Sequence, residues 1–174
     1  MKRSFPTLQM IGFIFTGILG TFLHFLFDLS GNNAFVALFS AVNESIWEHL
    51  KLLYYPMVLF AVVEYFLGGK AYCHFWQGKL IGTIVGLSAI VIFYYTYTGI
   101  FGSNVDWLNI AIFFIAAALA FYAETIYIRK IGKSFSRKIA IFLLFLPILF
   151  FTIFTFFPPR IPLFLDPVTN TLGF

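Results

Sequence analysis

The sequence predicts an all-α integral membrane protein, a polytopic bundle of five transmembrane helices. The first observation is composition: of 174 residues, 61% are hydrophobic and only 10% are charged, and the mean hydropathy is +0.94. The second is run length, because a bilayer core of about 30 Å requires about 20 apolar residues in a helix. We therefore expect residues 1–174 to form a single transmembrane domain in the lipid bilayer of the cell membrane.

Five apolar runs are expected to cross the membrane in succession. They cover about residues 8–27, 48–67, 80–101, 108–128 and 139–157. The second run is the shortest, since Leu52–Leu67 contains only 16 residues, which rise about 24 Å as a helix. We expect this span either to take a further turn from its N-terminal side, Trp47–Lys51, or to lie in a thinned part of the bilayer.

Basic residues predict the orientation of the bundle. A cytoplasmic N-terminus places on the inner side Lys2, Arg3, Lys70, Lys79, Arg129, Lys130, Lys133, Arg137 and Lys138. The outer side then keeps only Lys51 and Arg160. Because cytoplasmic loops are enriched in Lys and Arg, we expect a cytoplasmic N-terminus and an extracytoplasmic C-terminus. The net charge of +4 then follows from topology and requires no nucleic-acid partner.

Two segments at the outer end are not expected to span. Residues 34–42 are apolar but number only nine, so we expect a re-entrant or interfacial segment, buried in protein or lining a watery cavity. The tail Pro158–Phe174 contains four prolines, which forbid a continuous helix. We expect a non-helical outer C-terminal tail that folds back over the mouth of the bundle.

Gly78, Gly82 and Gly86 repeat every four residues in the third span. Small residues at this spacing let a second helix approach closely. Packing within the chain is the favoured interpretation, and a homo-oligomer through this face is the alternative.

Acidic and histidine residues gather at the predicted outer end. His24 and Asp28 lie four residues apart, and Glu44 and Glu48 repeat that spacing, so each pair shares one face of a helix. Imidazole and carboxylate ligands suit zinc, manganese or iron(II). The candidate metal ligands are therefore His24, Asp28, Glu44 and Glu48, and the candidate cofactor is a divalent metal ion.

Four neighbouring residues are secondary candidates for the same site. They are Asn43, Trp47, His49 and Asp166. His49 follows Glu48 directly and points about 100° away from it on a helix, so these two are not expected to face one ion. Asp166, in the returning tail, is a candidate lid residue.

Helix capping is the competing interpretation of the stretch NESIWEHLK. Ser45-x-x-Glu48 has the form of a capping box, and Glu48 can pair with Lys51 three residues further along. Capping accounts for the glutamates but does not account for His24 and Asp28.

Glu64 and Glu124 fall near the inner ends of the second and fourth spans. Snorkelling toward Lys70, and toward Arg129 or Lys130, is favoured over a proton-relay role.

Several motifs resemble one family of small prokaryotic integral membrane proteins of unknown function. They include FSAVNESIWEHLKLL (Phe39–Leu53), HFLFDLSGNN (His24–Asn33), YTYTGI (Tyr95–Ile100) and PPRIPLFLDPVTNTLG (Pro158–Gly173). The family pattern reads NESxWEHLK and PPxIPLFxDPxT. The resemblance covers nearly the whole chain and implies no particular activity.

Three functions remain open at this point. The leading one is an outward-facing His/Asp/Glu site that binds a cation, in a small transporter or an accessory membrane component. The alternatives are a membrane-embedded metal-dependent hydrolase at the outer leaflet, with a glutamate as general base, and a structural or regulatory subunit without chemistry. GxSxG, HExxH and phosphate-binding glycine loops are absent from the sequence, so no soluble-enzyme motif decides whether the protein is an enzyme.

Overall fold

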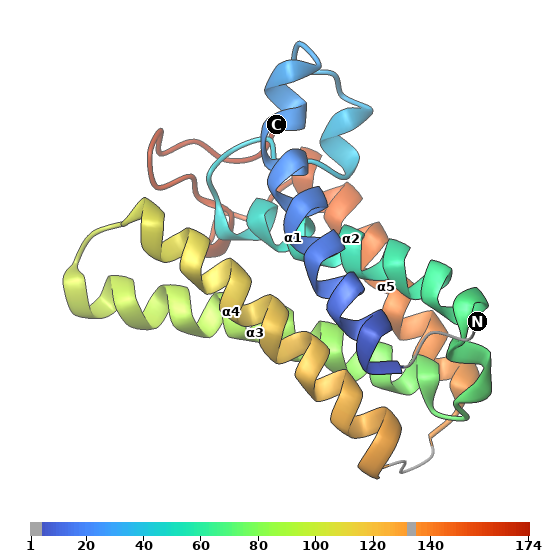
Figure 1. Cartoon of the computed structure of the whole chain (residues 1–174). Coiled ribbons are helices and arrows are strands. Elements are labelled where there is room, and N and C mark those ends of the chain that lie inside the picture. The colour runs from blue at the N-terminus through green and yellow to red at the C-terminus, as the bar shows by residue number, and fades with distance from the viewer. Residues whose placement is uncertain (1–4, 132–134) are drawn as a thin grey trace.

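Five long helices make up the bundle in the computed structural model, which describes residues 5–131 and 135–174. They are α1 (Phe5–Leu29), α2 (Ile46–Leu67), α3 (Phe75–Phe101), α4 (Asp106–Ile126) and α5 (Arg137–Phe156) (Figure 1). Each is long and apolar enough to cross a membrane, and the described residues contain no β-strand. The predicted all-α class with five candidate spans is confirmed.

α2 gains the length that its apolar run lacked by beginning at Ile46. Ser45 is the N-cap, and its hydroxyl oxygen accepts a hydrogen bond from the backbone N–H of Glu48 at 3.4 Å. This is the first half of the predicted capping box. The Glu48 side chain does not return to the cap, because it accepts instead from the backbone N–H of Val42 at 3.1 Å. Glu44 lies outside the helix.

α3 and α4 form an antiparallel pair, with the glycine face of α3 turned toward α4 (Figure 1). A Cβ at Gly78 would lie 2.3 Å from the Ile128 side chain, and a Cβ at Gly82 would lie 2.7 Å from the Ala120 carbonyl oxygen. No side chain fits at such distances. The glycine face thus packs within the chain, as favoured above, and a homo-oligomer through it stays a prediction.

The irregular segments lie where α1 ends and α2 begins (Figure 1), which is named the outer end after the predicted orientation. The segment 34–42 contains a single 3-10 turn, Val36–Leu38. Ser40 ties it to α1, because its Oγ accepts from the backbone N–H of Phe27 at 3.1 Å and donates to the carbonyl oxygen of Leu23. Its irregular backbone is therefore held against protein, as a re-entrant or interfacial segment requires.

The C-terminal tail returns to the outer end after α5. It contains one 3-10 turn, Pro162–Phe164. The backbone N–H of Phe174 donates to the carbonyl oxygen of Thr155 at 2.9 Å, and its ring centroid lies 5.7 Å from that of Phe27. The prediction of a non-helical tail that folds back is confirmed.

Two lysines of the orientation argument are buried inside helices. Lys79, which the prediction placed just before the third span, lies inside α3, and Lys51 lies inside α2, within its predicted span. Each is buried because carboxylates contact it, as described below. Lys2, Arg3 and Lys133 lie outside the described residues, and the orientation itself stays a prediction.

The glycine contact between α3 and α4 generates a stability prediction. We expect Gly82→Ala to lower the free energy of unfolding by about 1–3 kcal/mol, because the new methyl group overlaps the α4 backbone. Gly99→Ala, in the same helix with no atom within 4 Å of its new Cβ, should be neutral or stabilising by about 0.5–1 kcal/mol. Unfolding in detergent followed by circular dichroism measures both, and equal effects would contradict close α3–α4 packing.

Candidate functional site

His24, Glu44 and His49 meet at the outer end of the bundle, although they come from α1, the connecting loop and α2. Nε2 of His24 lies 3.7 Å from Oε1 of Glu44, and Nε2 of His49 lies 3.4 Å from Oε2 of Glu44. The imidazole centroids are 5.3 Å apart. One ligand atom of each residue lies within 4.8 Å of the others, so this cluster, the outer site, can hold one metal ion.

His49 is oriented by its own helix. Nδ1 lies 2.9 Å from the carbonyl oxygen of Ser45, and since a carbonyl only accepts, Nδ1 carries the proton. Nε2 therefore faces the Glu44 carboxylate at 3.4 Å, where it can carry a proton or donate its lone pair to a metal ion. Histidines that bind metals commonly donate their other N–H in this way.

His24 has no such orienting partner. Its Nδ1 is buried and has no hydrogen-bond partner among the described residues, while its ring lies edge-on to Phe25. The tautomer of His24 is therefore set by whatever Nε2 binds.

The structure brings together two of the four predicted ligands, His24 and Glu44. Asp28 is exposed one turn beyond His24 and is not part of the group whose ligand atoms meet. Glu48 is buried in an ion pair with Lys51. Because adjacent residues point about 100° apart on a helix, the rotation of α2 that buries Glu48 turns His49 toward His24.

The Glu48–Lys51 pair connects α2 to two other segments. Nζ of Lys51 donates to the carbonyl oxygen of Ala37 at 2.8 Å and to Oγ1 of Thr155 at 3.0 Å. Thr155 in turn donates to Oε1 of Glu48 at 2.9 Å. Buried ion pairs require such additional hydrogen bonds, so this pair fixes the 34–42 segment and α5 against α2. The pairing of Glu48 with Lys51, raised above as part of the capping interpretation, is therefore present in the structure.

Asp166 in the tail holds the loop that carries Glu44. Its Oδ2 accepts from the backbone N–H of Glu44 at 3.4 Å, and its Oδ1 accepts from the N–H groups of Val168 at 2.7 Å and Thr169 at 3.2 Å. Burial disfavours the charged carboxylate, but these N–H groups outweigh burial and hold the pKa of Asp166 below its usual value. Asp166 thus positions Glu44 through its backbone, and its role as a lid stays a prediction.

Asn43 and Trp47 contact the tail and not the outer site. Nδ2 of Asn43 donates to the carbonyl oxygen of Gly173 at 3.0 Å. The ring of Trp47 packs on Phe164, with 4.8 Å between centroids. Both residues therefore help to anchor the tail on the start of α2.

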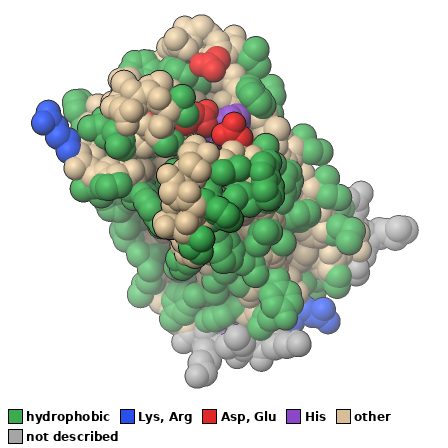
Figure 2. Space-filling model, turned by 90° about the vertical axis from the view of Figure 1, so that its left-hand side faces the viewer, with side chains coloured by type: hydrophobic (Ala, Val, Ile, Leu, Met, Phe, Trp, Pro, Cys, Tyr) green, Lys and Arg blue, Asp and Glu red, His purple; other side chains and the backbone are tan. Residues whose placement is uncertain are grey.

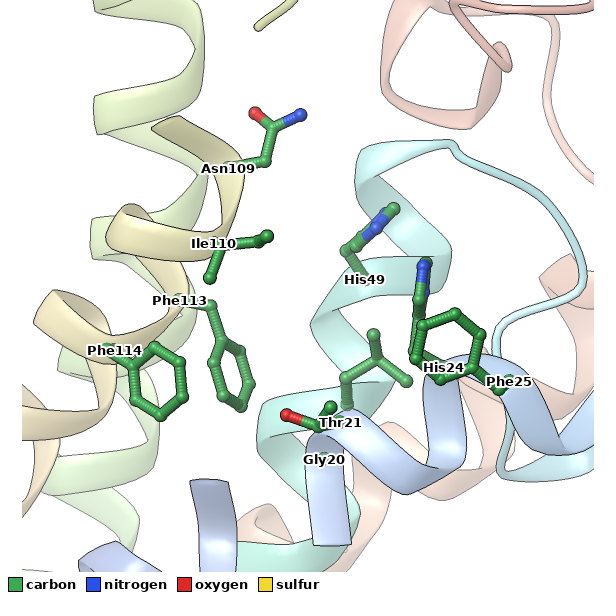
Figure 3. Close-up of a pocket in the computed structure, with 10 residues that line it drawn as sticks. Gly20, Thr21, His24, Phe25, His49, Asn109, Ile110, Phe113 and Phe114 are labelled. Carbon is green, nitrogen blue, oxygen red and sulfur yellow. The ribbon is translucent and has the colours of Figure 1, made fainter. Parts of the chain in front are cut away.

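A cavity of about 200 Å³ opens beside the two histidines, between α1, α2 and α4 (Figure 3). It is lined mostly by apolar side chains and backbone, from Gly20, Thr21, His24, Phe25, His49, Leu52, Asn109, Ile110, Phe113 and Phe114. Figure 3 shows the histidine rings on one side and Phe113 and Phe114 opposite. On the face in Figure 2, histidine lies beside acidic side chains with hydrophobic side chains around them. The site can thus accept an apolar group next to a polar one.

A smaller cavity of about 30 Å³ touches Glu44 and His49 together with Tyr94 and Asn109. It is large enough for a water molecule and offers polar partners to one. Tyr97 holds Asn109 in place, with 2.6 Å from its hydroxyl to Oδ1 of Asn109. Asn109 was not among the predicted site residues. The signal that could have identified it is its polar amide in the first turn of an otherwise apolar span.

A second polar cluster, the inner cluster, is buried at the opposite end and was also missed. Lys79 contacts Glu64, and its Nζ lies 2.6 Å from Oε1 of Glu124. Both glutamates have no exposed surface, so the prediction that they snorkel toward loop cations is wrong. The signal was Lys79 itself, one residue before the apolar run of the third span.

Comparisons with known proteins give one match. The model of a family described as a family of unknown function (DUF6512) matches residues 4–174, a range that includes both polar clusters. No curated protein and no solved structure matches the chain.

The buried Glu48–Lys51 pair generates a second stability prediction. Lys51→Met leaves the Glu48 carboxylate buried without its cation and should lower the free energy of unfolding by about 3–5 kcal/mol. The double variant Glu48→Gln, Lys51→Met should recover part of that loss. Glu44→Gln is the matched control, because its side chain is 46% exposed, and its effect should stay within about 0.5 kcal/mol. Denaturant unfolding measures all three, and a Lys51→Met protein as stable as Glu44→Gln would contradict the structural role.

Asp166 generates a pH prediction for the tail. Because its pKa is lowered by folding, its contribution is complete above the ordinary value of 3.8 and is lost as the pH falls through the lower folded value. We expect the amides of Val168 and Thr169 to lose hydrogen-exchange protection over that acid range, after correction for intrinsic exchange rates. Asp166→Asn should show weak protection and no such step. A tail equally protected in the variant would contradict the anchoring role.

Proposed function

Because the chain belongs to DUF6512, a family of unknown function, we propose its function from the chemistry of the outer site. The protein is a multi-pass membrane protein that binds a divalent cation there through His24, Glu44 and His49. One observation carries this proposal: ligand atoms from three separate segments lie within 4.8 Å of one another.

The distances support a small metal ion. With metal–ligand bonds of about 2.0–2.1 Å, two ligands of a tetrahedral ion lie about 3.3 Å apart. The two histidine–glutamate distances, 3.7 Å to Oε1 and 3.4 Å to Oε2 of Glu44, are close to that value and end on different oxygens. With one ligand atom from each residue, the three atoms lie within 4.8 Å of one another, so binding requires the carboxylate and the imidazoles to shift closer together.

The donor set favours zinc. Two histidines and one glutamate form a ligand set of catalytic zinc sites, which leave a fourth position for water. The 30 Å³ cavity beside Glu44 and His49 supplies room for that water. Manganese and iron(II) are the other ions that suit this set.

Cation binding in a small transporter or accessory component is the leading function. A metal-dependent hydrolase is the second candidate, and the 200 Å³ cavity favours it. A bare cation needs no apolar wall, whereas a lipid-like substrate would place its chain against Phe113 and its polar group at the ion. A metal ion in the outer site would lower the pKa of bound water and supply the nucleophile.

The test is metal binding by the purified protein. We expect zinc at 100 times its dissociation constant to stabilise the fold by about 2.7 kcal/mol, seen as a rise in the thermal midpoint, with one ion per chain by elemental analysis. His24→Ala, Glu44→Gln and His49→Ala should each abolish the rise. His74→Ala, a histidine that precedes α3, is the matched control and should keep it.

The outcomes separate the alternatives. Absence of bound metal, with no thermal shift from zinc, manganese or iron(II), would overturn the proposal and remove the metal-dependent versions of both candidate functions. Equal losses in His74→Ala and His49→Ala would show that binding is nonspecific. If zinc binds, Phe113→Ala should keep the shift while reducing hydrolysis of a lipid substrate, if the protein is a hydrolase.

A further inference from the structure

Four helices each contribute one polar side chain to the inner cluster. They are Gln9 from α1, Glu64 from α2, Lys79 from α3 and Glu124 from α4, none more than 7% exposed. Lys79 contacts Oε2 of Glu64 and lies 2.6 Å from Oε1 of Glu124. A single ammonium group is therefore shared by two carboxyl groups.

The charges of this cluster do not cancel when both carboxyl groups are ionised. Among the side chains that the structure describes, the charged groups that face Glu124 are Lys79 from α3 and Glu64 from α2, and α1 contributes the uncharged Gln9. Two carboxylates and one ammonium leave one negative charge in a closed apolar interior, where an unpaired charge is costly. One bound proton removes it.

The contacts show which carboxyl group takes the proton. Glu64 accepts a hydrogen bond at Oε1 from Nε2 of Gln9 at 2.8 Å and contacts Lys79 through Oε2. Both oxygens of Glu64 therefore face a donor, and neither is free to carry a hydrogen. Oε2 of Glu64 and Oε2 of Glu124 are both buried with no hydrogen-bond partner among the described residues, but Oε2 of Glu64 is in ion-pair contact with Lys79. Glu124 meets Lys79 through Oε1, which leaves its Oε2 as the oxygen free to carry a hydrogen.

The same cluster also contains an acceptor for that hydrogen. Oε1 of Gln9 is also buried without a hydrogen-bond partner in the described part of the chain. Across from Glu124, a Cβ on Gly82 would lie 3.1 Å from its Oε2, so glycine leaves the oxygen unobstructed. An acid O–H at this position can thus be accommodated.

We propose that the inner cluster is a proton-binding site, in which Oε2 of Glu124 holds one exchangeable proton beside the Lys79–Glu64 ion pair. The proton comes from water at the inner end and returns to it, with no other co-reactant. The site gives the bundle a means to couple its packing to pH. This inference does not depend on the outer site or on any bound metal.

Infrared spectroscopy of the purified metal-free protein in lipid vesicles tests the proposal. We expect one C=O band of a protonated carboxylic acid at neutral pH, shifted in D₂O and lost as the pH is raised. Glu124→Gln should remove the band and should still fold, because the amide resembles the protonated acid. Glu44→Gln is the matched control and should keep the band.

Glu64→Gln provides the sharper variant. It removes the additional negative charge, so Glu124 should ionise beside Lys79 and the band should disappear although Glu124 is still present. Absence of the band in the wild type, its survival in Glu124→Gln or Glu64→Gln, or a Glu124→Gln protein that cannot fold would each overturn the proposal.

Discussion

Charges buried in this apolar bundle must be neutralised by their neighbours, and the arrangement of the helices follows from that constraint. Lys51 is buried where it meets Glu48, the Ala37 carbonyl and Thr155, which joins α2 to the outer loop and to α5. Lys79 is buried where α2 and α4 each supply a carboxyl group. Because an unpaired charge in such surroundings costs several kcal/mol or more, these contacts restrict how each helix can rotate.

The outer site is a consequence of that restriction. Once Glu48 faces Lys51, the next residue on α2 turns toward α1, which brings His49 to 5.3 Å from His24. Glu44 reaches both rings because the tail residue Asp166 accepts a hydrogen bond from its backbone N–H. Along residues 44–51, the candidate metal ligands Glu44 and His49 thus alternate with Glu48 and Lys51, which form the buried ion pair. Helix capping and metal binding therefore do not exclude each other in this stretch.

Local patterns predicted the site in part. The i, i+4 spacing pointed to polar residues at the outer ends of the first and second spans, but the structure separates both pairs. Asp28 is exposed one turn beyond His24, whereas Glu44 lies before the helix and Glu48 faces α5 through Thr155. Asn109 and Lys79 carried only a weak signal, since one polar residue near the end of an apolar run reads as a boundary residue. Their partners come from other helices, up to 45 positions away for Lys79 and Glu124.

Five helices, a non-helical tail and an irregular outer segment could be inferred from the chain alone, because hydropathy, proline content and run length are sums over neighbouring residues. Which polar side chains meet could not, because that depends on the rotation and depth of each helix within the bundle. Those two quantities are set by long-range contacts, above all the carboxylates that surround Lys51 and Lys79. The folded bundle therefore selected His49 over Glu48 for the outer site and drew Glu64 and Glu124 inward around Lys79.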